Sequence, residues 1–224
     1  MEIVPGIHQV DGVKANCYII VGDSLTLIDT GFPHSTKKIV KYIEEILKRK
    51  PSDINTIVLT HAHIDHIGNV GELKKISNAN VAIHEAEADY LTGRKPQPAR
   101  KSFLGIILKI MSLFFKAPHL EPDIRLKDGD IIDGLTCIYT PGHTPGSICL
   151  FSSSSKVMFA GDLLRFDGRK IEGAPRQFTM DTAESERSIK KIAARDFDVI
   201  LPGHGIPLRP DASVKIREYA DSLP

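Results

Sequence analysis

The stretch from Leu59 to Asn69 reads LTHAHIDHIGN and places three histidines and one aspartate within six residues. It follows the apolar, β-branched run INTIVL, which is typical of a buried strand. In extended chain, residues two apart point to the same side, so His61 and His63 are predicted to bind one cation together. Asp65 and His66 are adjacent, at the start of a predicted helix, and cannot share that direction. The four side chains therefore point two ways, which favours two neighbouring metal ions over one.

Four side chains cannot complete two metal sites, so further ligands are expected at other strand ends. His143 lies in PGHTPGS, Asp162 in FAGDLL and His204 in LPGHG, and each follows a strand-like run. A glycine precedes each of them, which lets the backbone turn sharply and bring a ligand close. Each turn alone is a weak signal, because a single histidine in such a turn is more often a hydrogen-bonded or surface residue. Of the remaining histidines, only His34, which follows DTGFP, is considered for the rim of the site.

Composition narrows the class of protein. The 224 residues include 29 Lys and Arg against 28 Asp and Glu, a net charge of +1, which gives no reason to expect a nucleic-acid partner. Three cysteines are too few and too scattered for a disulfide framework. The start MEIVPGIHQVDG lacks the pattern of a secretory signal, so a cytoplasmic location is expected. No apolar run reaches the length of about 18 residues that a membrane-spanning helix needs.

Strand-like and helical patterns alternate along the chain. Eight apolar runs bounded by Gly, Pro, Asp or Ser predict strands at 16–21, 25–29, 54–60, 80–84, 136–140, 147–151, 156–160 and 198–202. Helices are predicted at 35–50, 182–194 and 211–221. LTLIDTG and KVMFAGD echo each other, since each is a strand that ends at an Asp beside a Gly. We therefore expect two similar halves, each a sheet with helices outside, within a single domain over 1–224.

An apolar insert at about 94–122 interrupts the pattern between the two halves. Its centre, FLGIILKIMSLFF at 103–115, reads as a helix with a wide apolar surface and lysines around it. It is too short to span a bilayer. A lid, a homodimer contact, an interfacial membrane contact and a hydrophobic wall for an acyl-type substrate all stay open.

The spaced ligands together make the sequence similar to the metallo-β-lactamase fold superfamily, from LIDTG at 27–31 to PGHG at 202–205. This resemblance implies an α/β fold, an αβ/βα four-layer sandwich of two mixed sheets with helices on the outer faces. It also implies a supporting role for Asp29 behind the ligands. The resemblance assigns His61, His63 and His143 to one metal, Asp65, His66 and His204 to the other, and Asp162 to both.

Two divalent ions carry a charge of +4, which Asp65, Asp162 and a bridging hydroxide reduce to about +1. Such a centre favours an oxyanion on the substrate, and the bridging hydroxide replaces a Ser or Cys nucleophile. Asp65 is the candidate that passes a proton to the leaving group. Imidazole and carboxylate ligands suit zinc, which is the first choice, and also iron or manganese.

Departures from family patterns narrow the resemblance to the glyoxalase II-like and lactonase-like hydrolases, rather than the true β-lactamases. The predicted substrate is a small molecule with a thioester, lactone or other small ester bond. Arg165 and Arg169 follow the bridging aspartate and are candidates for contacting a substrate anion, although a solvated Arg165 fits equally well. Ile171 stands where a glutathione-contacting Tyr is expected, which argues against glutathione thioesters. A mononuclear iron persulfide dioxygenase-like enzyme and a phosphodiesterase of the same fold are the alternatives.

Overall fold

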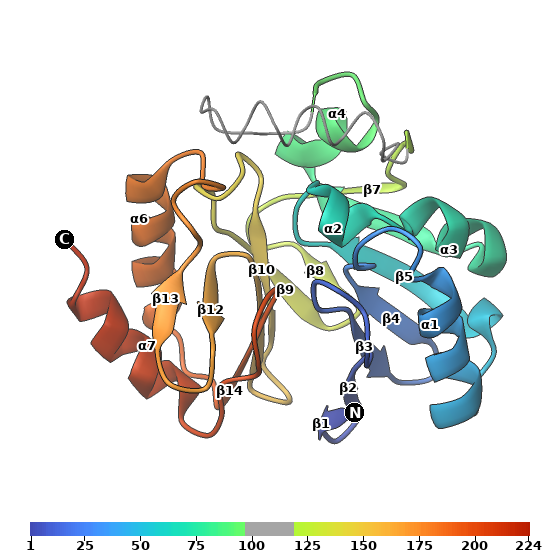
Figure 1. The fold of residues 1–224 in the computed structure, drawn as a ribbon, viewed down its shortest axis with the longest axis horizontal. Helices are drawn as coiled ribbons and strands as arrows, with labels where there is room; N and C mark the ends of the chain where they lie inside the picture. The colour runs from blue at the N-terminus through green and yellow to red at the C-terminus, as the bar shows by residue number, and fades with distance from the viewer. Residues whose placement is uncertain (97–118) are drawn as a thin grey trace. The chain divides into compact units, whose positions relative to one another are not determined.

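The computed structural model describes residues 1–96 and 119–224, which form two compact units. The first unit holds residues 1–96 and 119–125, and the second holds residues 126–224. Each unit has its own mixed β-sheet and its own helices (Figure 1). The predicted α/β class with two mixed sheets is confirmed, whereas a single domain over 1–224 stays a prediction.

Seven strands form the sheet of the first unit, in the spatial order β1-β2-β3-β4-β5-β6-β7. They are β1 (Glu2–Val4), β2 (Ile7–Gln9), β3 (Tyr18–Val21), β4 (Leu25–Ile28), β5 (Ile54–Leu59), β6 (Asn80–His84) and β7 (Ile124–Leu126). Strands β1 to β4 pair antiparallel, whereas β4, β5 and β6 are parallel, with Leu27 opposite Ile57 and Leu59 opposite Ile83. The carboxyl ends of these three parallel strands therefore meet at one edge of the sheet.

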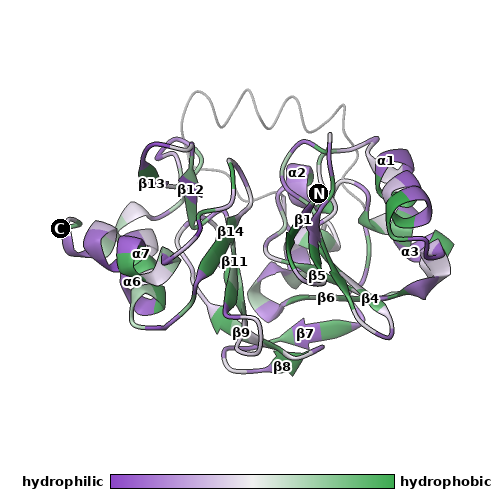
Figure 2. Ribbon diagram, turned by 90° about the horizontal axis from the view of Figure 1, so that it is seen from below, coloured by the Kyte–Doolittle hydropathy of each residue, from purple (hydrophilic) through white to green (hydrophobic). Residues whose placement is uncertain are grey.

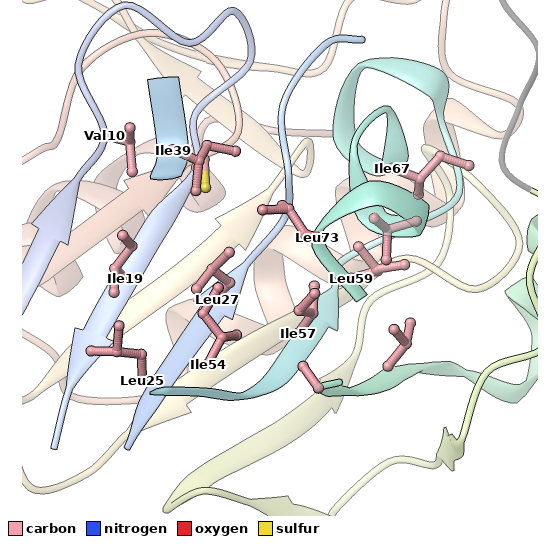
Figure 3. Close-up of a cluster of buried hydrophobic side chains, with 14 of the residues drawn as sticks. Val10, Ile19, Leu25, Leu27, Ile39, Ile54, Ile57, Leu59, Ile67 and Leu73 are labelled. Atoms are coloured by element: carbon pink, nitrogen blue, oxygen red, sulfur yellow. The ribbon is translucent and has the colours of Figure 1, made fainter. Parts of the chain in front are cut away.

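Helices cover one face of this sheet. They are α1 (Thr36–Lys41), a π-helical turn (Tyr42–Ile46), α2 (Ile64–Ile67) and α3 (Val70–Ser77), with 3-10 turns at Pro51–Asp53 and Glu85–Glu87 and the short α4 (Ala88–Leu91). Ile39 of α1, Ile67 of α2 and Leu73 of α3 are buried in one cluster with Leu27 and Ile57 (Figure 3). Alternation places Leu25 and Leu27 of β4 on the same face. Each such side chain contributes about 1.5–3 kcal/mol on burial.

The sheet of the second unit has five strands in the order β14-β11-β10-β9-β8. They are β8 (Ile131–Ile132), β9 (Leu135–Tyr139), β10 (Ile148–Ser152), β11 (Val157–Gly161) and β14 (Val199–Pro202). Strands β11 and β14 are parallel, and the other neighbours are antiparallel. A separate hairpin joins β12 (Leu164–Phe166) to β13 (Ile171–Gly173). The eight predicted strands are all present, whereas the shortest strands of both units were missed.

Two helices, α6 (Thr182–Ala193) and α7 (Ala212–Asp221), pack together on the second unit (Figure 1). Ile189 and Ile216 are buried in a cluster with Met158 and Ile200, and the hydrophobic colour of β11 and β14 in Figure 2 marks the same core. Helix α6 begins after Asp181, whose side chain accepts the N–H of Glu184 at 2.9 Å. This N-terminal cap agrees with the helix predicted to begin at residue 182.

The helix predicted to begin at Asp65 is instead broken into α2 and α3 at Asn69. The Asn69 side chain donates to the carbonyl oxygens of Thr30 and Phe32 at 2.6 and 2.9 Å, and accepts the N–H of Ser35 at 2.8 Å. These bonds satisfy buried backbone groups of the loop after β4, which a continuous helix would leave without this partner. The break therefore ties the two loops at this edge of the sheet together.

The central part of the apolar insert, residues 97–118, lies outside the described residues, and so does the predicted apolar helix. The described ends of the insert are held together in the first unit. Arg94 forms an ion pair with Glu121, and the N–H of Leu120 donates to the carbonyl oxygen of Leu91 at 3.2 Å. Within the described ranges 1–96 and 119–224, no helix is long and apolar enough to cross a membrane.

Candidate metal centre

The loop that follows β5 carries four of the predicted ligands, and we call residues 60–66 the ligand loop. His61 Nε2 lies 3.1 Å from His63 Nδ1, as expected for side chains two residues apart in extended backbone. The ring of His66 has its centroid 4.2 Å from that of His61, and His66 Nε2 lies 3.9 Å from Asp65 Oδ2. The first unit therefore gathers all four predicted ligands of LTHAHIDHIGN at one place.

Asp29, which follows β4, supports the ligand loop through hydrogen bonds to Thr60 and His66. Its carboxylate accepts the backbone N–H of Thr60 at 2.8 Å and the Thr60 hydroxyl at 2.7 Å, and it lies 2.8 Å from His66 Nδ1. The supporting role implied by the resemblance therefore agrees with these contacts. Because a carboxylate only accepts, the neutral His66 ring donates through Nδ1 and keeps the Nε2 lone pair for a metal.

The hydrogen bonds of Asp29 and Thr60 also orient the ring of His61. The single hydroxyl hydrogen of Thr60 is directed to Asp29, so Thr60 Oγ1 accepts from His61 Nδ1 across 3.1 Å. His61 then keeps its Nε2 lone pair on the side of His63. Thr60 was missed from the sequence, because a Thr at a strand end has no signal of its own. Its place between the strand INTIVL and the first histidine was the available clue.

Three separate turns carry the predicted ligands of the second unit, and we call residues 141–147, 161–163 and 202–205 the ligand turns. His143 Nε2 lies 3.5 Å and His204 Nε2 lies 3.4 Å from the same oxygen, Asp162 Oδ2. Asp162 and His204 follow the parallel strands β11 and β14, whose ends lie side by side. The second unit therefore brings its three predicted ligands together around Asp162.

Two glycines make these turns possible. Gly142, before His143, has φ +129°, and a Cβ there would lie 2.2 Å from the backbone N of Ser185. Gly205, after His204, has φ +92°, and a Cβ there would lie 2.3 Å from the carbonyl oxygen of Phe166. Both backbones approach other elements too closely for a side chain, which explains the glycines that frame these ligands.

The ligand atoms within each unit are spaced as a metal site requires. Two donors bound to one tetrahedral zinc at about 2.0–2.1 Å are roughly 3.3 Å apart. The separations of 3.1, 3.5 and 3.4 Å in the two units are close to that value. All donors are imidazole nitrogens or carboxylate oxygens, which suit divalent metals. The residues present in each unit therefore fit a metal site.

Cysteine does not contribute to this donor set. Cys17, Cys137 and Cys149 are free and buried, as expected for the apolar runs that contain them. Burial raises the pKa of the Cys137 and Cys149 thiols to about 12, and it also raises the pKa of Cys17. Such thiols stay protonated near neutral pH and are poor nucleophiles and ligands.

The predicted anion contacts lie on the hairpin of the second unit. The Arg165 guanidinium donates from Nη2 and Nε to Glu172 Oε2 at 2.5 and 3.0 Å, and Lys170 Nζ lies 2.5 Å from Glu172 Oε1. The hydrogen bonds from Lys170 and then Arg165 hold the pKa of the Glu172 carboxyl below its usual range. The backbone N–H of Arg169 donates to Asp167 Oδ1 at 2.8 Å. Arg165 thus already has an acidic partner, and the anion-binding role of both arginines stays a prediction.

Comparison with known proteins identifies the family. The model of the metallo-beta-lactamase superfamily matches residues 10–204. The probable metallo-hydrolase YflN of Bacillus subtilis is 33% identical over 92% of this chain and 86% of its own. The chain belongs to the metallo-beta-lactamase superfamily, as the resemblance predicted, and it has the fold of that family. A divalent metal site in a metallo-hydrolase is the function that this membership and the ligand clusters support.

Two further similarities concern a thioesterase relative and a solved structure of the same fold. The bovine acyl-coenzyme A thioesterase MBLAC2 is 28% identical over 86% of this chain and 74% of its own. The solved structure of TTHA1623 in a di-iron-bound form has a TM-score of 0.70 and 22% identity, and it covers 90% of this chain and 93% of that one. The first similarity concerns a relative's substrate, and the second shows the shared fold.

Proposed function

We propose that the chain is a dinuclear metal-dependent hydrolase that cleaves a thioester of an acyl group. The observation that carries the proposal is the spacing of imidazole and carboxylate donors within each unit, at 3.1 to 3.5 Å. Membership of the family and the thioesterase relative support the reaction type. A lactone or another small ester stays within the same proposal, because the bond broken is an acyl bond in each case.

In the proposed centre, the ligand loop and the ligand turns complete one pair of metal positions. His61, His63 and His143 would hold the first metal, Asp65, His66 and His204 would hold the second, and Asp162 would serve both. Two divalent ions supply a water activated near neutral pH and an electrophile for the carbonyl oxygen. The chain's own contribution is to orient the imidazole nitrogens, which it does in the first unit through Thr60 and Asp29.

Asp65 is the proposed proton donor to the leaving group. Its side chain is 31% exposed, whereas that of His66 is fully buried, so a carboxylate oxygen of Asp65 remains accessible to a substrate. A metal-bound carboxylate carries no proton of its own, so Asp65 would take the proton that the attacking water loses and pass it over a short distance to the leaving atom. A thiolate leaving group needs less help from such a proton than an alkoxide does, because its conjugate acid has a lower pKa.

Zinc is the proposed metal, since histidine and carboxylate ligands without cysteine suit it and it needs no redox partner. Iron is the competing choice, because a protein of the same fold has been solved in a di-iron-bound form. The donor set fits both, so elemental analysis decides between them.

The decisive experiment combines metal analysis with a substrate panel. Protein purified without chelator is analysed for zinc, iron and manganese. It is then assayed against short and long acyl thioesters, lactones, a phosphodiester and a β-lactam. We expect two zinc ions per chain and thioester hydrolysis that a chelator abolishes and added zinc restores.

Other outcomes separate the alternatives. One iron per chain with oxygen uptake on a persulfide indicates the dioxygenase. Two metals with turnover of the phosphodiester alone indicate a phosphodiesterase. A stoichiometry below one metal per chain, with no turnover of any ester, contradicts the proposed centre itself.

A further inference from the structure

We propose that Glu87 is a positioning residue for the ligand loop, which it holds through the backbone of Ala62. This inference rests on the proposed metal centre. Glu87 closes the 3-10 turn Glu85–Glu87 that follows β6, and its side chain is completely buried. Its Oε2 accepts the backbone N–H of Ala62 at 2.9 Å.

The position of Ala62 explains how this hydrogen bond can affect the two histidines. Ala62 stands between His61 and His63, and its N–H belongs to the peptide bond that joins it to His61. Fixing that N–H fixes the plane of the His61–Ala62 peptide, the first of the two peptides between the histidines. The convergence of His61 Nε2 and His63 Nδ1 to 3.1 Å depends on that backbone conformation. Glu87 therefore acts on metal binding without touching a metal.

The sheet explains how a residue so far along the chain reaches the loop. Strands β5 and β6 are parallel neighbours, with Leu59 opposite Ile83. The ligand loop leaves the end of β5, and the turn with Glu87 leaves the end of β6, so both lie at the same edge. Glu87 therefore reaches Ala62 directly across this edge.

A buried carboxylate at this position needs hydrogen-bond donors that offset the cost of removing its charge from water. A buried charge is costly unless it is hydrogen-bonded, and a hydrogen bond from a backbone N–H to a charged acceptor is stronger than a neutral one. Asp29 is the other buried carboxylate of the first unit that accepts from this loop, at Thr60. The two carboxylates hold the backbone on either side of His61, Asp29 at Thr60 and Glu87 at Ala62.

Two substitutions separate the hydrogen bond from the charge. Glu87→Gln keeps an acceptor at the same reach and removes the charge. Glu87→Asp keeps the charge and withdraws the acceptor by one methylene. Glu85→Ala is the matched control, because Glu85 lies in the same turn and is exposed. Each metal-free full-length variant is titrated with Co²⁺ and Zn²⁺, recording affinity and the visible Co²⁺ spectrum, which reports ligand geometry.

We expect Glu87→Asp to weaken metal binding by about 10–100-fold, the range for residues that support a ligand, and to change the Co²⁺ spectrum. Glu87→Gln retains affinity within about threefold of the original chain, well inside that range, and Glu85→Ala leaves both readouts unchanged. The inference is overturned if Asp retains the original affinity and spectrum, or if Gln loses as much as Asp. A lower melting temperature with unchanged metal affinity and spectrum shows a structural role only and overturns it as well. If the original chain binds no metal, the proposed function fails, not this inference alone.

Discussion

The ligand loop of the first unit and the ligand turns of the second unit hold similar side chains in different ways. The loop carries four predicted ligands in six residues, and Asp29 and Glu87 accept hydrogen bonds from its backbone. The turns each carry one ligand, and the contact that their side chains share is with Asp162. The histidines of the loop are thus oriented by Thr60 and Asp29, which lie outside the proposed ligand set, whereas the histidine side chains of the turns contact Asp162, which is itself a proposed ligand.

This difference predicts that substitutions in the two units affect different quantities, stability without metal in the first unit and metal content in the second. A support such as Asp29 stabilises the loop whether or not a metal is bound, because its hydrogen bonds are internal to the protein. Asp162, by contrast, has two imidazole nitrogens 3.4–3.5 Å from one of its oxygens, and as the proposed shared ligand it would act chiefly through a bound metal. Losing a support should lower stability without metal, and losing Asp162 should chiefly lower metal content.

The largest effect is expected for Asp162→Ala. It removes the proposed shared ligand, and transition-state stabilisation of several kcal/mol corresponds to roughly a 10³-fold loss of kcat. Metal content should fall from two ions per chain, while urea unfolding of the metal-free protein changes little. Asp221→Ala, at the exposed end of α7, is the control. Full activity of Asp162→Ala with two metals bound would remove Asp162 from the centre.

Asp65→Asn tests the ligand loop for a chemical role. We expect turnover to fall about 10²-fold, the lower end for general acid catalysis, with a smaller loss of metal. The amide still offers an oxygen to the metal but cannot donate the proton in the same way. Turnover per bound metal is the quantity to measure. Equal losses of metal and turnover would count against proton transfer.

Asp29→Ala tests the support of the loop. It leaves buried donors on Thr60 and His66 without their acceptor, which costs about 3 kcal/mol of the free energy of unfolding. The metal-free protein should show this loss in urea, and metal affinity should fall about 10–100-fold. Asp23→Ala, in the exposed turn before β4, is the control. A change seen only with metal bound would show that the two units are supported alike.

Arg165→Ala is expected to have the smallest effect. Its side chain is 46% exposed and already paired with Glu172, so the contribution to a substrate anion is about 1 kcal/mol, or roughly fivefold in KM. KM is compared for an anionic and a neutral thioester of equal chain length. A rise for the anionic ester alone supports the contact, and equal changes for both esters leave Arg165 as a surface residue.

The sequence was most informative where the pattern was long or chemically unusual. The eight predicted strands have enough apolar residues to be recognised, whereas β8 and β12 have two and three residues and show no alternation. The break at Asn69 depends on hydrogen bonds to a loop over thirty residues earlier, which local helix propensity does not record. Local pattern therefore predicts elements better than it predicts their ends.

The same contrast holds in the candidate centre. The seven candidate ligands were visible because four of them lie within six residues and the other three each follow a glycine at a strand end. Glu87 was not, because HEAEAD reads as an exposed charged stretch. Its role depends on β5 and β6 being parallel neighbours, which places the ends of both strands at one edge. Strand pairing was the missing information, not residue chemistry.

The order of β4, β5 and β6 along the chain also determines when the ligand loop can form during synthesis of the protein. Asp29, the ligand loop and Glu87 are delivered by these three successive parallel strands, so the whole arrangement is encoded between residues 29 and 87. Translation supplies all of it before the first ligand turn of the second unit leaves the ribosome. The four ligands of the loop are thus available to a growing chain earlier than the three that complete the proposed centre.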